Sequence, residues 1–227
     1  MAKKKKTVNP DAVYKNGMHV ERTNQCLLQG VKILAFMGVV VVFSYIVSMI
    51  PAGLFGVAIA KENTTTQSVY DIQNIVLALI GLVIFAIGGR IIGKMAGEND
   101  AMLAYRYSLA RTPDMKYLLI PIGMAVLVFM IIGVVMNIDF FAGPAKYLGI
   151  FFCRAERRIN EGIKVPFIHR LLAMLICMAV ETPMMIKGAV DGFREKMSSL
   201  ESVEADEKAR EAERAAAEAA ANAKERK

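Results

Sequence analysis

Residues 72–92 read IQNIVLALIGLVIFAIGGRII, and this stretch decides the fold class of the chain. It contains no acidic residue, and Arg90 near its end is its only basic one. A helix of about 20 apolar residues crosses the hydrocarbon core of a bilayer, which is about 30 Å thick, because each residue rises about 1.5 Å. The stretch therefore predicts a transmembrane helix.

Three further stretches are similarly apolar, at 33–60, 117–138 and 165–186. The first two contain no charged residue, whereas the last contains His169, Arg170 and Glu181 and is the weakest of the four. We predict an all-α membrane protein, a bundle of four transmembrane helices with a helix lying in the membrane interface and a long charged C-terminal helix.

The composition argues against an enzyme. The four spans leave no soluble stretch of about 100 residues, the usual size of a folded domain. No phosphate-binding glycine loop, His-Glu zinc pattern, paired-Cys motif or nucleophile–base pair is present. The soft sulfur donors Met174, Cys177 and Met178 lie close together, but methionine is an ordinary core filler. We expect no catalytic residue, no metal and no cofactor.

The net charge of +7 is unevenly distributed along the chain. Residues 1–32 form a basic N-terminal segment with seven Lys and Arg residues and two acidic ones, a net charge of +5. We assign 33–193 to the transmembrane bundle and 194–227 to a helix rich in Ala, Glu, Lys and Arg. The basic N-terminal segment is expected to lie on anionic headgroups of the bilayer, and we expect no nucleic acid partner.

Local signals predict separate helices before and after the bundle. Residues 18–32 favour a short surface helix that leads into the first span. The sequence Ser198-Ser199-Leu200-Glu201 fits a capping box, which predicts the start of a new, solvated helix over 200–226.

The segment 145–163 has hydrophobic residues at helical spacing and predicts an amphipathic helix on the membrane surface. Its basic residues lie elsewhere around the helix and form a surface for lipid or a partner: Lys146, Arg154, Arg157 and Arg158. An ordinary loop helix packed on the protein is the alternative that we rank second.

Basic loops favour the cytoplasmic side of a membrane, or its equivalent. We therefore predict both termini on that side of a plasma membrane or an organelle inner membrane. The basic third loop, 139–164, then falls outside and conflicts with the rule. A helix on the outer headgroups, re-entry of 139–152 into the membrane, or a covering partner would explain the conflict. We favour the first and third explanations together.

Two groups of residues within the spans are candidate sites. Gly89, Gly93 and Gly97 form overlapping Gly-x-x-x-Gly units, which predict close helix packing within the chain or with a neighbour. Arg170 and Glu181 share one face of the fourth span and form a possible intramembrane polar site. Because both lie near the ends of that span, the simplest interpretation is that they reach water or headgroups.

These features together predict a non-catalytic membrane subunit with a structural or assembly role, whose partners are the lipid bilayer and other membrane protein subunits. The alternative is a small transporter, channel or pore component. Transporters usually place charges or broken helices near the middle of the membrane, and this feature distinguishes the two functions.

Overall fold

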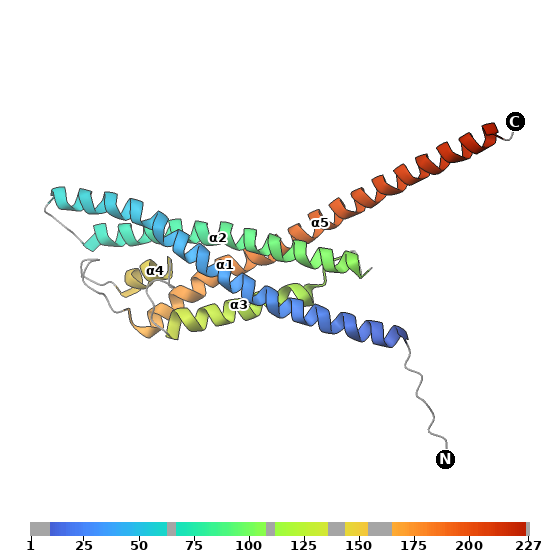
Figure 1. Ribbon diagram of the computed structural model, residues 1–227. Coiled ribbons are helices and arrows are strands. Elements are labelled where there is room, and N and C mark those ends of the chain that lie inside the picture. Colours follow the sequence, from blue (N-terminus) through green and yellow to red (C-terminus); the bar gives the residue numbers. More distant parts are fainter. Residues whose placement is uncertain (1–9, 63–66, 108–111, 136–143, 154–164, 226–227) are drawn as a thin grey trace, which may run out of the picture.

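The computed structural model describes residues 10–62, 67–107, 112–135, 144–153 and 165–225 (Figure 1). Within these residues the chain is all-helical, with five helices and no strand. The helices are α1 (Pro10–Glu62), α2 (Gln67–Arg106), α3 (Met115–Val135), α4 (Pro144–Cys153) and α5 (Phe167–Glu225). The predicted all-α class is therefore confirmed for the described part of the chain.

Four of these helices, α1, α2, α3 and α5, are long and apolar enough to cross a membrane. α1 and α2 contain the apolar stretches 33–60 and 72–92, α3 covers residues 117–135 of the third stretch, and α5 covers residues 167–186 of the fourth. Many large apolar side chains on the outer faces of these helices are exposed. Such faces are typical of helices surrounded by lipid. The described fold thus indicates a membrane-embedded protein, while the side on which the termini lie stays a prediction.

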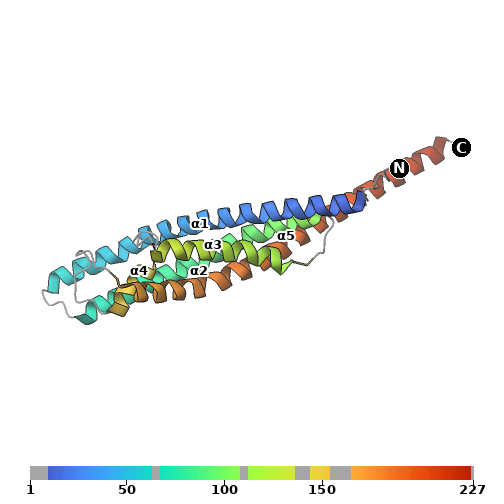
Figure 2. The same cartoon turned by 90° about the horizontal axis from the view of Figure 1, so that it is seen from below.

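The four long helices α1, α2, α3 and α5 alternate in direction, so that the start of α1 and the end of α5 lie at the same end of the bundle (Figures 1 and 2). α2 and α5 run parallel, and their contact is the most extensive between any two described helices. The main core lies between α1, α2, α3 and α5, and its largest buried side chains include Phe85, Phe129 and Met37.

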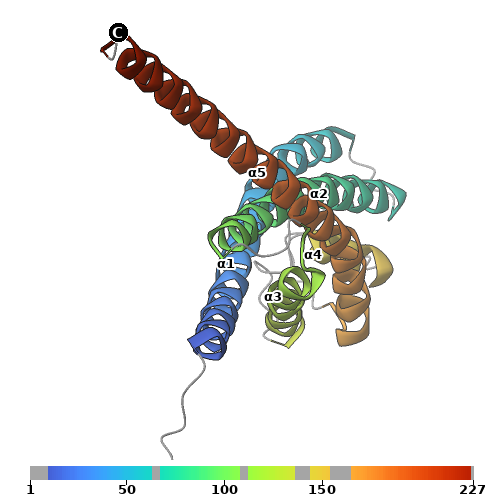
Figure 3. The same cartoon turned by 90° about the vertical axis from the view of Figure 1, so that its right-hand side faces the viewer.

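α5 is one continuous helix of 59 residues that leaves the bundle at its C-terminal end (Figures 1 and 3). The predicted helix start at Ser198 is therefore wrong: the helix continues through this residue, and Ser202 donates a hydrogen bond to the carbonyl of Ser199. The flanking residues are strong helix formers, and they override the capping signal. We call residues 198–225 the arm.

α1 and α2 also extend beyond their predicted spans. α1 begins at Pro10 and has 53 residues, so no break separates a surface helix from the first span. α2 has 40 residues and continues to Arg106, well past the end of its apolar stretch at Ile92. At about 1.5 Å per residue, both helices are longer than a bilayer is thick and must project from it.

The short helix α4 packs inside the molecule, against α2 and α5, and buries Ala145 and Ile150. A Cβ atom added to Gly81 would stand 2.5 Å from Cβ of Pro144 and 3.2 Å from Oγ of Ser44. Gly81 is in the middle of the 72–92 stretch, so α4 begins at the level of the centre of the span. This position agrees better with the packed and re-entrant alternatives than with a helix on the headgroups.

Only one of the four basic residues of the predicted interfacial surface lies within the described residues. Lys146 lies in α4 and is half-buried. The residues Arg154, Arg157 and Arg158 lie outside the described residues, so their role as a lipid or partner surface stays a prediction.

Candidate functional site

Glycines let α2 and α5 approach closely. A Cβ atom added to Gly93 would collide with the backbone carbonyl of Met185, and one added to Gly97 would collide with that of Ala189. At Gly89 the added atom would stand 2.9 Å from the carbonyl oxygen of Glu181. The three glycines lie on one face of α2 at a spacing of four residues, so the whole face is open to backbone contact.

α5 contributes a matching pair of glycines that the sequence reasoning missed. A Cβ atom added to Gly188 or Gly192 would collide with the carbonyl oxygen of Arg90 or Lys94, respectively. The signal was present, because Gly188 and Gly192 themselves form a Gly-x-x-x-Gly unit. It was overlooked because the unit lies beyond the predicted end of the fourth span.

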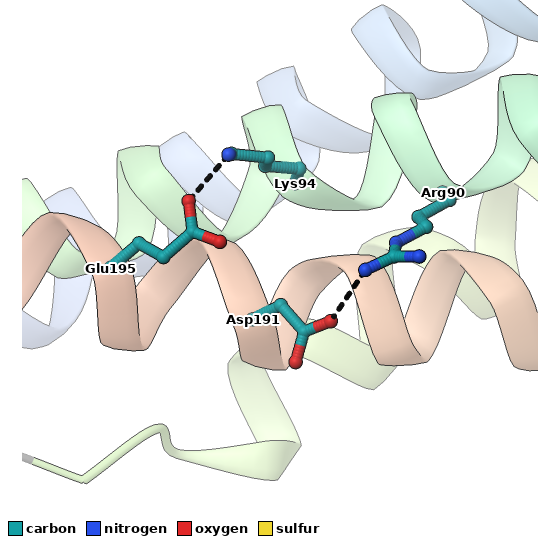
Figure 4. Close-up of polar contacts among 4 residues, drawn as sticks. All are labelled: Arg90, Lys94, Asp191 and Glu195. Carbon is teal, nitrogen blue, oxygen red and sulfur yellow. Dashed lines mark hydrogen bonds and ion pairs between the residues drawn. The ribbon is translucent and has the colours of Figure 1, made fainter.

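Polar pairs join the same two helices beside the glycines (Figure 4). Nη2 of Arg90 lies 3.4 Å from Oδ2 of Asp191, and Nζ of Lys94 pairs with the carboxylate of Glu195. Both pairs are substantially exposed, so each contributes only weakly to the stability of the contact. Their main effect is to fix which turn of α5 lies against which turn of α2.

A third polar contact between these helices involves the arm. The hydroxyl of Tyr105 donates a hydrogen bond of 3.1 Å to Glu204, which also pairs with Lys208 one turn further along. Tyr105 lies well beyond the apolar stretch of α2, and this hydrogen bond raises the pKa of its hydroxyl group above the usual value. α2 therefore supports the beginning of the arm as well as the bundle.

Glu181 is the most unusual residue of the α2–α5 contact. Its side chain is 0% exposed, and neither carboxyl oxygen has a hydrogen-bond partner within the described structure. Its Cγ atom lies 3.0 Å from the position that a Cβ atom would take on Gly89. The expectation that Glu181 reaches water or headgroups thus differs from the structure, because α2 covers it.

Within the described residues, the helices around Glu181 carry few charges. The apolar parts of α1 and α3, residues 33–51 and 117–135, contain no charged residue. Arg90 is adjacent to Gly89 in the sequence, but its side chain pairs with Asp191. An ionisable group buried in this way is expensive, and inside a membrane such groups mark functional positions by default.

Arg170 has a different environment from Glu181. Its guanidinium donates hydrogen bonds of 3.1 Å to the carbonyl of Val134 and 2.8 Å to that of Val165. Val134 lies in the last turn of α3, where carbonyl groups lack partners within the helix. Arg170 therefore ties the end of α3 to the start of α5 instead of extending into the headgroups.

Arg170 and Glu181 lie on one face of α5, as the sequence predicts, but they do not contact each other. Met174 and Cys177 lie between them along α5, and both are buried in the core. Eleven residues separate Arg170 from Glu181, which corresponds to about 16 Å along the helix. The structure thus holds two separate polar positions and not one ion pair.

The described residues contain no group of three or more His, Cys, Asp or Glu side chains that could hold a metal ion. Cys26 and Cys177 are both buried, and neither forms a disulfide within the described residues. Comparison of the chain with protein-family models, with curated proteins and with solved structures found no match. Function must therefore be inferred from the geometry of the chain itself.

Proposed function

We propose that this chain is a non-catalytic subunit of a larger membrane protein complex, in which the bundle anchors the arm and the arm binds a partner. The observation that carries this proposal is the continuity of α5 from the bundle to the end of the arm. A partner bound to the arm would be held at a fixed position relative to the membrane, because no loop interrupts the helix.

The surface of the arm supports a role in binding. Every side chain of residues 205–216 is exposed, so nothing in the described chain covers this part of the helix. An isolated helix gains little stability from its propensity alone, and most helices in proteins are stabilised by packing. The mixed charges of the arm, among them Glu207, Arg210 and Glu213, suit a polar partner outside the membrane.

Shortened chains test the proposal. A chain that ends after Met197 keeps all residues of the two buried clusters and loses the arm. We expect mild-detergent extracts to yield the full chain bound to another polypeptide by native mass spectrometry, and the shortened chain alone. A chain that ends after residue 216 is the matched control for the loss of the last residues. A full chain that is always monomeric would contradict the proposal.

A small transporter, channel or pore component is the second candidate, and two observations favour it. Glu181 is an unpartnered carboxyl group within a span, and α4 begins opposite Gly81 at mid-membrane level. Transport proteins place polar groups and short helices at this depth. Ion flux into liposomes that contain the pure chain, lost in Glu181→Gln, would favour this candidate over the first.

A further inference from the structure

A groove of about 160 Å³ lies between residues 29–36 of α1 and residues 92–99 of α2. Its polar lining consists of Gln29 and Lys32 from α1 and Asn99 from α2. Its apolar lining includes Ile33, Phe36 and Ile92. The groove is thus polar at one end, near Gln29 and Asn99, and apolar at the other, near Phe36 and Ile92.

The groove lies where both helices leave the apolar layer. Lys32 is the last residue before the apolar stretch of α1, and Ile92 is the last residue of the apolar stretch of α2. Because the two helices are antiparallel, these limits meet at the same level, and both line the groove. The border between hydrocarbon and headgroups would therefore cross the groove itself.

The charge of this region suits an anion. Lys32 is exposed at the rim, and the adjoining segment 1–32 has a net charge of +5. Asp100, a buried carboxyl on α2, lines an adjacent small pocket that shares Gln29 with this groove, but it does not itself line the groove. Basic pockets between transmembrane helices commonly bind the headgroups of anionic lipids.

We propose that this groove binds an anionic phospholipid, with the phosphate beside Lys32, Gln29 and Asn99 and the upper part of an acyl chain against Phe36 and Ile92. A groove of about 160 Å³ has room for part of one lipid. The site lies on the bundle, away from the arm, so this proposal is independent of the proposed partner.

The absence of tryptophan from the chain provides a direct test. In Phe36→Trp the only indole of the protein lies at the groove, and lipids brominated near the top of the acyl chain quench its fluorescence. In phosphatidylcholine vesicles we expect brominated phosphatidylglycerol to quench it with about a fivefold preference over brominated phosphatidylcholine. This factor corresponds to one basic residue near an anionic surface. Adding Lys32→Gln should abolish the preference.

Two controls separate this site from general lipid contact. Leu127→Trp places the indole on the outer face of α3, where the native side chain is 61% exposed, and should show no headgroup preference. Lys116→Gln removes an exposed charge outside the groove and should leave the preference of Phe36→Trp intact. Equal quenching of Phe36→Trp by both lipids, quenching by neither, or a preference that survives Lys32→Gln would overturn the proposal.

Discussion

Gly93 of α2 lies directly against the backbone carbonyl of Met185 of α5, with no room for even one methyl group between the two helices. In a membrane, helices gain nothing from excluding lipid-like surface, and close packing of their backbones supplies the attraction instead. This contact is therefore the main determinant of the distance between α2 and α5, and the position of the arm follows from it.

Gly93→Ala should reduce the stability of the bundle by about 1–3 kcal/mol, because the added methyl group forces the two backbones apart. The loss is measurable as a lower midpoint of unfolding in a mixed-detergent titration. Gly123→Ala is the control, since a Cβ atom there meets nothing within 4 Å. It should be neutral or stabilising by up to about 1 kcal/mol. Equal effects of the two substitutions would contradict the packing described for Gly93.

Glu181→Met should raise the stability of the bundle by about 1–3 kcal/mol, because it removes two buried oxygen atoms that lack partners and keeps an unbranched side chain. Thermal unfolding in detergent provides the measurement. Glu211→Met changes the same residue type on the exposed arm and should have almost no effect. A clear loss of stability in Glu181→Met would mean that the carboxyl group has a partner.

Arg170→Gln should destabilise the bundle by about 1–3 kcal/mol, because it removes two charged hydrogen bonds to the carbonyls of Val134 and Val165. Protection from proteolysis at the end of α3 should decrease as well. Arg194→Gln, at an exposed position of α5, should leave both properties unchanged. An unaltered stability of Arg170→Gln would support the simpler view that this residue only reaches toward headgroups.

The ion pair Arg90–Asp191 predicts that reversing one of its charges lowers the stability of the bundle and that exchanging both charges restores it. Arg90→Asp and Asp191→Arg should each cost about 1 kcal/mol or less, since the side chains are 55% and 32% exposed. The double substitution should recover most of that loss, because opposite charges again face each other. The comparison of all four proteins in low salt measures the coupling energy. If the double variant recovered no stability, the two side chains would not interact.

The four apolar helices could be predicted from the sequence because the bilayer imposes a length and a composition on any spanning helix. The limits of the helices could not, because residues beyond the apolar stretches carry no comparable constraint. At Ser198 a local capping signal suggested a helix start, yet the flanking Ala, Glu and Lys residues continue the helix.

The environment of Glu181 also lies beyond sequence reasoning. Its position near the end of an apolar stretch suggested contact with water, but exposure depends on what lies opposite. The absence of a side chain at Gly89 lets α2 cover the carboxyl group. The position of α4 could not be predicted either, because its hydrophobic pattern fits a membrane surface and a protein interior equally well. Only the packing of Pro144 against Gly81 distinguishes the two.

We propose that the bundle holds the arm in a fixed direction, and a distance measured between the two tests this claim. Spin labels on Ile87 of α2 and Glu211 of the arm, in a chain whose three cysteines are replaced, report this geometry by double electron–electron resonance. A continuous helix predicts one narrow distance distribution, which two glycines inserted after Leu200 should broaden. A distribution that is already broad without the insertion would contradict the claim.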